Sequence, residues 1–241
     1  MQATAVEVIE ANCRQECEFK RAVSLLQSDN PKNQITGVKK LRALKDKRAV
    51  RYLVRALEKE FGKRTGLWAW IIPALGDFKD PTAVPVLVKA LEIEDDTWLG
   101  REKAVVALGE IGSSKAVSAL VRAAEREETR MAAMVALGEV HDERAIPVFL
   151  SALYPEEEQE IRDAAMRGLR GLGSVAVPAM IKAFSAYSAE HPDTKRRVWL
   201  CRLLGESRDR RAEETLRKAL KDPDEAVRGC AEAHIHGMTE E

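Results

Sequence analysis

The sequence predicts an all-α protein, a right-handed α–α superhelix of about six two-helix repeats with a cap at each end. The tripeptide Arg-Ala-Val and its near copies recur at intervals of roughly 27 to 36 residues, the length of a two-helix unit. Apolar residues follow each copy at helical spacing. Aromatic residues make up only 5% of the 241 residues, and no stretch shows sustained strand-like alternation. The central alanines of the copies are Ala22, Ala49, Ala83, Ala116, Ala145, Ala176 and Ala212.

Each alanine centre opens a predicted second helix of its repeat. After Ala49, for example, Val50, Leu53, Val54 and Leu57 form one apolar stripe. A small residue also recurs seven positions after the centres, where it would let neighbouring helices pack closely. These residues are Ala56, Ala90, Ala123, Ala152, Ala183 and Ala219.

A Leu-Gly signature predicts where the first helix of each repeat ends. It occurs at 74–76, 107–109, 136–138, 171–173 and 203–205. Glycine suits the left-handed residue that closes a helix, because it has no Cβ to clash. Three residues before most centres lies a short oxygen-bearing side chain, which we expect to cap the next helix. These capping residues are Asp46, Asp80, Ser113, Asp142 and Asp209.

The repeats run without a Gly/Ser-rich or Pro-rich linker, so we expect one continuous solenoid over residues 1–241. Residues 1–34 are predicted as an N-terminal cap, residues 35–222 as the repeats and residues 223–241 as a C-terminal cap.

A column of arginines lies seven residues before the last apolar residue of the first helices, with Trp68 at the same position in an earlier repeat. The planar guanidinium group suits a bidentate bond to a turn or to a capping carboxylate, so we interpret the column as a structural ladder between repeats. Its members are Arg101, Arg130, Arg162, Arg197 and Arg228.

The phrases at 115–123, 135–147 and 221–228 resemble HEAT-like repeats of the phycobilisome-lyase class, and the resemblance covers about residues 17–241. That class includes bilin lyases, a deoxyhypusine hydroxylase and scaffolds, so the resemblance implies a fold and leaves several functions open. The hydroxylase branch binds iron through repeated His-Glu pairs, and this sequence contains none. A bilin lyase implies an aromatic-lined groove, for which the candidates are Trp68, Trp70, Trp98, Tyr187 and Trp199. Trp70 and Trp199 occupy the same repeat position, which alternatively indicates a structural slot between repeats.

Metal binding and catalysis have no support in the sequence. Cys13 and Cys17 are one helical turn apart but lack further ligands nearby, and we expect both to be buried in the cap, with Cys201 in the core. The four histidines, His141, His191, His234 and His236, do not complete a metal site. We therefore expect no cofactor and no metal. The order of residues at the start is not that of a signal peptide, and no apolar run approaches the length of a membrane span. Four cysteines in a chain of this length do not indicate a disulfide framework. We therefore expect a cytoplasmic protein.

A second column carries the functional prediction. Six residues after the centres, five of six positions are basic, and in a solenoid of this kind they would line the concave face. They are Arg55, Lys89, Arg122, Lys182 and Lys218, with Ser151 as the exception.

We interpret this concave basic stripe as a site for an acidic protein, and the chain as a non-catalytic scaffold. A preference for basic residues near helix ends is the competing explanation. A bilin-lyase-type or chaperone-like cofactor handler is the alternative function. Nucleic acid is a weaker candidate partner, because the formal net charge is +0. No membrane binding is expected, and the oligomeric state stays open.

Overall fold

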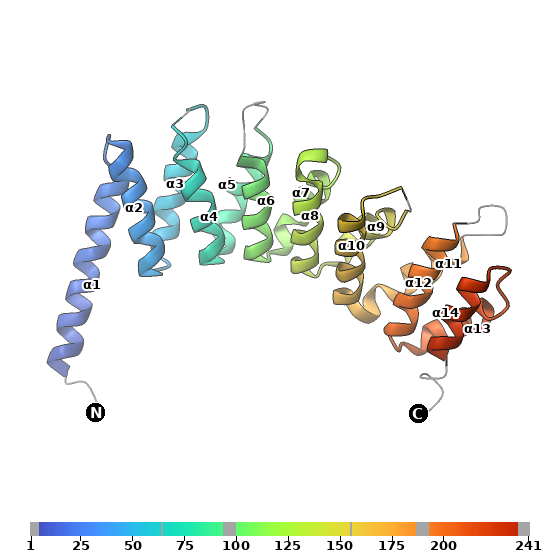
Figure 1. Cartoon of the computed structure of the whole chain (residues 1–241). Helices are drawn as coiled ribbons and strands as arrows, with labels where there is room; N and C mark the ends of the chain where they lie inside the picture. The colour runs from blue at the N-terminus through green and yellow to red at the C-terminus, as the bar shows by residue number, and fades with distance from the viewer. Residues whose placement is uncertain (1–4, 64, 94–99, 155, 187–192, 236–241) are drawn as a thin grey trace. The chain divides into compact units, whose positions relative to one another are not determined.

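The structure is a computed structural model that describes residues 5–63, 65–93, 100–154, 156–186 and 193–235. Within these residues the ordered elements are α-helices and short 3-10 turns, packed pairwise along the chain as an α–α solenoid (Figure 1). The predicted all-α solenoid is therefore confirmed. The chain divides into two compact units, Met1–Ala119 and Leu120–Glu241, which we describe separately.

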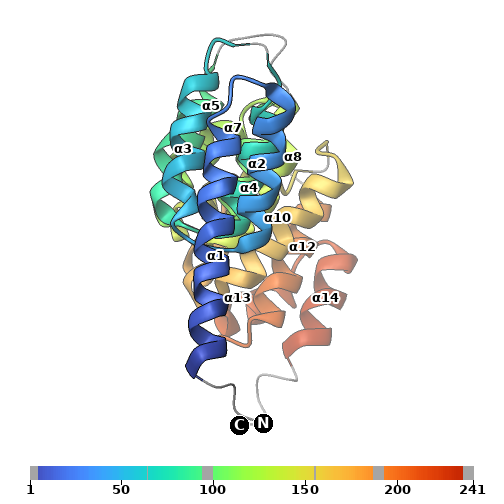
Figure 2. The same cartoon turned by 90° about the vertical axis from the view of Figure 1, so that its left-hand side faces the viewer.

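In the first unit, the first helices of successive repeats pack on one another in the order α2, α4 and α6, with α1 against α2. The second helices α3 and α5 pack against α4 and α6 respectively and also contact each other. Figure 2 shows α3 and α5 on one side of this unit and α2 on the other. The elements are α1 (Ala5–Leu26), α2 (Pro31–Leu44), α3 (Ala49–Glu60), α4 (Trp68–Phe78), η1 (Pro81–Ala83), α5 (Val84–Leu91), α6 (Gly100–Ile111) and η2 (Ser114–Ala116).

The second unit repeats this arrangement. The first helices pack in the order α8, α10, α12 and α14, while α9, α11 and α13 pack against α10, α12 and α14. Helix α7 (Val117–Ala123) spans the division between the units. The other elements are α8 (Glu127–Val140), η3 (Glu143–Ala145), α9 (Ile146–Ser151), α10 (Gln159–Leu172), η4 (Gly173–Val175), α11 (Val177–Ser185), α12 (Thr194–Glu206), η5 (Arg210–Ala212), α13 (Glu213–Ala219) and α14 (Glu225–Ile235).

The alanine centres are the most completely buried repeat position. All seven, from Ala22 to Ala212, have no exposed surface. In the column seven residues further on, Ala56 and Ala183 are partly exposed, whereas the other four members are buried. A side chain larger than alanine at a centre would overlap the helices that meet there.

The predicted capping residues do cap. The side-chain oxygens of Asp46, Asp80 and Asp142 accept hydrogen bonds of 2.9 to 3.0 Å from the backbone N–H two residues further on. Asp209 accepts a bond of 2.9 Å and Ser113 one of 3.4 Å in the same way. In four of the five repeats, the residues that follow the cap form a 3-10 turn before the α-helix begins. The caps therefore satisfy the free N–H groups of that turn.

The predicted role of the Leu-Gly glycines is wrong at Gly76, Gly109, Gly138 and Gly205. These first helices continue past the glycine, and the left-handed residue lies three positions later. Those closing residues are Lys79, Gly112, His141 and Arg208, with φ of 50°, 65°, 52° and 50°. Only Gly173 among the signature glycines has a positive φ, 56°.

The interior glycines instead let neighbouring first helices approach closely. A Cβ on Gly76 would lie 3.0 Å from the Cα of Ala107, and one on Gly205 would lie 2.4 Å from the Cβ of His234. A Cβ on Gly138 would lie 3.8 Å from the Cα of Gly168. The glycine signature thus marks helix–helix contacts more than helix ends.

Among the described residues, no helix combines the length and apolar character needed to cross a membrane. The boundaries at 1–34, 35–222 and 223–241 stay a prediction.

Candidate partner-binding surface

The arginines of the ladder column bind the loops between repeats. Arg101 donates to the carbonyl oxygen of Ile93 at 2.5 Å, and Arg162 to that of Glu157 at 3.0 Å. Arg228 donates to the carbonyl oxygens of Asp222 and Pro223 at 2.8 and 2.9 Å.

Two members of the column also form ion pairs, Arg130 with Glu157 and Arg197 with Asp222. The side chains of the two acidic partners are largely buried, with Glu157 12% and Asp222 10% exposed. The acidic partners lie 27 and 25 residues after their arginines, a separation that helical periodicity does not reveal. These guanidinium groups are held by carbonyl oxygens and carboxylates of their own chain.

The members of the basic column are all exposed, but their surroundings differ. Arg55 on α3 and Lys89 on α5 belong to the first unit. Arg122, Lys182 and Lys218 belong to the second unit, where Lys218 forms a 2.7 Å ion pair with Glu214 on its own helix. That pair neutralises part of the charge in the second unit. A stripe of all five residues stays a prediction.

A pocket of about 300 Å³ lies beside Arg55 in the first unit. Arg55, Lys59 and Lys63 line it together with Tyr52, and all three cations are exposed. One of its two carboxylates, Glu60, is 6% exposed and accepts a hydrogen bond from the hydroxyl of Thr65.

The other carboxylate is that of Asp29, so cations outnumber the remaining acid. Lys89 extends this surface, because its Nζ lies 5.2 Å from the ring centroid of Phe61, the residue after α3. We name this set, Arg55, Lys59, Lys63 and Lys89, the α3–α5 basic patch.

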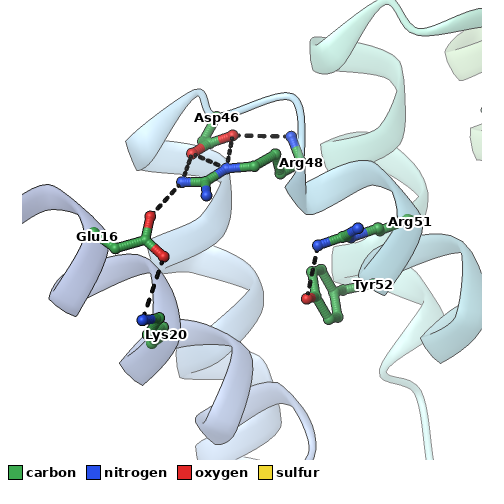
Figure 3. Close-up of polar contacts among 6 residues, drawn as sticks. All are labelled: Glu16, Lys20, Asp46, Arg48, Arg51 and Tyr52. Atoms are coloured by element: carbon green, nitrogen blue, oxygen red, sulfur yellow. Dashed lines mark hydrogen bonds and ion pairs between the residues drawn. The ribbon is translucent and has the colours of Figure 1, made fainter.

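A second arginine motif escaped the sequence analysis. Asp46 caps α3 and also binds the guanidinium group of Arg48 at 2.7 Å, while Arg48 reaches Glu16 on α1 at 2.8 Å (Figure 3). The hydrogen bond with Arg48 holds the pKa of both carboxyl groups below their usual values. On the next turn, Arg51 donates to the hydroxyl of Tyr52 at 3.1 Å.

The same Asp-x-Arg arrangement recurs at 142–144 and 209–211. Hydrogen bonds from the side chain and backbone N–H of Arg211 lower the pKa of Asp209 to about 2. Arg211 also donates to the carbonyl oxygen of Ser174 at 2.7 Å, so it bridges to the preceding 3-10 turn. The repetition of Asp-x-Arg is visible in the sequence and would have revealed these contacts.

The three tryptophans in the described residues have different surroundings. Trp70 is 42% exposed with the Nζ of Lys39 lying 4.3 Å from its ring centroid, so the expected slot between repeats is wrong for Trp70. Trp199 is partly buried, and the Cζ of Arg162 lies 4.5 Å from its ring centroid. Trp68 is partly buried. Trp98 and Tyr187 lie outside the described residues.

One of the three cysteine predictions is confirmed and two are wrong. Cys13 and Cys17 are exposed, which corrects the expectation that both are buried, whereas Cys201 is buried in the core as expected. No group of three or more His, Cys, Asp or Glu side chains in the described part of the chain could hold a metal ion. His191 and His236 lie outside that part.

The geometry defines a repeat protein built from stacked helical hairpins, and the sequence comparison agrees. The chain belongs to the family of HEAT repeats, which match residues 19–99, 67–134, 93–170 and 181–232. None of the curated proteins matches the sequence significantly.

A solved structure of phycocyanin lyase shares the fold. The complex of CpcE and CpcF of phycocyanin lyase from Nostoc sp. PCC7120 matches with a TM-score of 0.55 and 22% identity, over 91% of this chain and 94% of that chain. Human deoxyhypusine hydroxylase in complex with glycerol matches with a TM-score of 0.46 and 18% identity, over 96% of this chain and 99% of that chain. The expected HEAT-like repeats are therefore confirmed at the level of family and fold.

Proposed function

We propose that this chain is a non-catalytic scaffold that binds an acidic segment of a partner protein on its second helices, anchored at the α3–α5 basic patch. The observation that carries the proposal is the contrast between two sets of basic residues. The arginines of the first helices and of the Asp-x-Arg turns are held by loops and carboxylates. The four patch cations are exposed, and three of them, Arg55, Lys59 and Lys63, line a pocket.

The pocket suits a carboxylate side chain better than a large cofactor. Its volume of about 300 Å³ is at the lower limit of small-molecule sites. An acidic side chain entering it would meet Arg55 and two lysines, which outnumber the carboxylates of Glu60 and Asp29. Charge complementarity of this kind determines specificity and the association rate.

The fold also supports an interaction role. Stacked helical repeats present extended surfaces on which a partner can lie. The similar phycocyanin lyase structure is itself a complex of two named proteins, CpcE and CpcF.

The alternative is a bilin-lyase-type or chaperone-like cofactor handler. Its support is the shared fold with phycocyanin lyase and the exposed face of Trp70. Trp70 is not part of the pocket beside Arg55, so that pocket does not offer a flat ligand an indole to stack on. A visible absorption spectrum of protein isolated from its own source tests this alternative, because a bound tetrapyrrole absorbs visible light.

The scaffold proposal is tested by charge reversal in the first unit. The triple variant Arg55→Glu, Lys59→Glu, Lys89→Glu should keep the wild-type circular dichroism, because all three side chains are exposed. Its affinity for a polyglutamate peptide, measured by fluorescence anisotropy, should fall at least about tenfold, or roughly 1.4 kcal/mol. Wild-type affinity should also fall as salt concentration rises.

A matched control reverses three exposed lysines elsewhere in the same unit, Lys40, Lys103 and Lys115. It changes the net charge by the same amount and should leave most of the affinity intact. Equal losses in both triple variants would mean that the peptide senses net charge alone, and the proposed anchor would be wrong. The same pair of variants then tests any partner recovered from the native cell.

A further inference from the structure

A pair of thiols lies between α12 and α14 in the second unit, outside the proposed binding surface. Cys201 on α12 and Cys230 on α14 lie at matching positions of two packed helices, and neither is in a disulfide. Gly205 and His234 lie four residues later on the same two helices, and a Cβ on Gly205 would lie 2.4 Å from the Cβ of His234. The two helices are thus close together one turn beyond the thiols.

The two thiols differ in exposure and surroundings. Cys201 has no exposed surface, whereas Cys230 is partly exposed. The Sγ of Cys230 lies 3.7 Å from the carbonyl oxygen of Val198 and 4.0 Å from Nδ1 of His234. That Nδ1 is 2.8 Å from the carbonyl oxygen of Cys230, which favours a hydrogen on Nδ1 and directs a positive edge of the ring toward this region.

The side chains around the two sulfurs favour the thiolate at Cys230 only. The hydrogen bond from Cys201, then the charges of His234 and Arg202, lower the pKa of Cys230 to about 6 despite partial burial. The same hydrogen bond and burial raise the pKa of Cys201, so its proton is retained. A thiolate at Cys230 and a neutral thiol at Cys201 form an attacking group and a resolving group.

We propose that Cys230 is a thiol-modification site that reacts with low-molecular-weight disulfides, and that Cys201 resolves the adduct into an internal disulfide between α12 and α14. In the first step the Cys230 thiolate attacks one sulfur of R–S–S–R, a new S–S bond forms and R–S⁻ leaves. In the second step the Cys201 sulfur attacks the Cys230 sulfur, its proton passes to solvent or to R–S⁻, and a second R–S⁻ leaves. Two cysteines lose two electrons in total, and the small disulfide is reduced to two thiols.

The test uses the full chain with Cys13→Ser and Cys17→Ser, because those two exposed thiols would react as well. The probe is 5,5′-dithiobis(2-nitrobenzoate), with released thionitrobenzoate followed by absorbance and the product weighed by intact mass spectrometry. The expected result is release of two thionitrobenzoates per chain, with a product that carries no adduct and has lost two hydrogens. Dithiothreitol should restore the starting mass.

Two variants separate the steps. With Cys201→Ala the adduct on Cys230 should persist, and one thionitrobenzoate should be released. With Cys230→Ser the folded chain should not react until guanidinium unfolds it, because Cys201 is buried. If the chain with Cys13→Ser and Cys17→Ser alone keeps its adduct, the resolving role of Cys201 is wrong, even if a further variant fails to fold. If Cys230 does not react in that folded chain, the whole proposal is wrong. Neither result bears on the α3–α5 basic patch.

Discussion

Replacing Gly168 by alanine should destabilise the second unit, although alanine is the better helix former. Gly168 lies within α10, and a Cβ there would fall 2.4 to 2.7 Å from three ring atoms of Phe149. Real Cβ atoms do not approach so closely, so the ring or the helix must move. Phe149 has no exposed surface, so the ring cannot move into solvent.

The expected size follows from two opposing terms. Removing a glycine from a helix interior gains about 0.8 to 1 kcal/mol. Overpacking a buried contact costs typically about 1 to 3 kcal/mol. Because the clash involves three atoms of a fully buried ring, we expect a cost in the upper half of that range. The free energy of unfolding should therefore fall by about 1 to 2 kcal/mol.

Urea titration followed by circular dichroism measures this change, and Gly229→Ala is the matched control. Gly229 lies within α14 with nothing within 4 Å of its would-be Cβ. The same substitution there should stabilise by about 0.5 to 1 kcal/mol. If Gly168→Ala proves as stable as wild type while Gly229→Ala stabilises, the close-approach explanation of the interior glycines is refuted.

Three further predictions concern packing, pairing and pH. Ala152→Leu should lower the free energy of unfolding by about 1 to 3 kcal/mol in a urea titration, whereas Lys89→Ala should change it by less than about 0.5 kcal/mol; equal, negligible effects would remove the packing argument. Arg197→Met should lower the free energy of unfolding by about 3 to 5 kcal/mol, because the carboxylate of Asp222, only 10% exposed, loses its ion-pair partner. Adding Asp222→Leu should recover part of this loss, and no recovery would contradict this account. The pKa of Asp209, lowered to about 2 by Arg211, lies below the unfolded value near 3.9, so its contribution is present above pH 4 and lost as the pH falls toward 2. Asp209→Asn should therefore reduce the loss of thermal stability between pH 4 and pH 2, and an unchanged profile would show that the pair is unimportant.

Features that depend on local sequence were predictable. The alanine centres and the capping residues act within a few positions of their own helix, so their spacing is enough to identify them. All seven centres are fully buried, and the capping side chains accept the expected backbone hydrogen bonds.

Features that depend on the neighbouring repeat were harder to predict. A glycine near a helix end has two explanations, a left-handed closing residue or a close helix contact, and the choice depends on what the next helix places against it. At Gly76 that neighbour is Ala107, and at Gly205 it is His234. The candidate site shows the same limit, because a basic residue has the same appearance in sequence whether a distant carboxylate holds it or not. Repeat position separates Arg197 in the ladder column from Arg55 in the basic column, but only the structure identifies Asp222 as the partner of Arg197.

The unequal lengths of the paired helices have a dynamic consequence. The first helices α8 and α10 have 14 residues each, whereas the second helices α7, α9 and α13 have only 7, 6 and 7. Helices this short have little stability of their own and depend on packing, so their amide hydrogens should exchange with solvent first. Helix α3, with 12 residues, is the longest second helix in the described part of the chain. No 3-10 turn precedes it. A partner that docks along α3 would therefore meet a surface that is already ordered, and little of the binding energy would be lost in fixing the backbone.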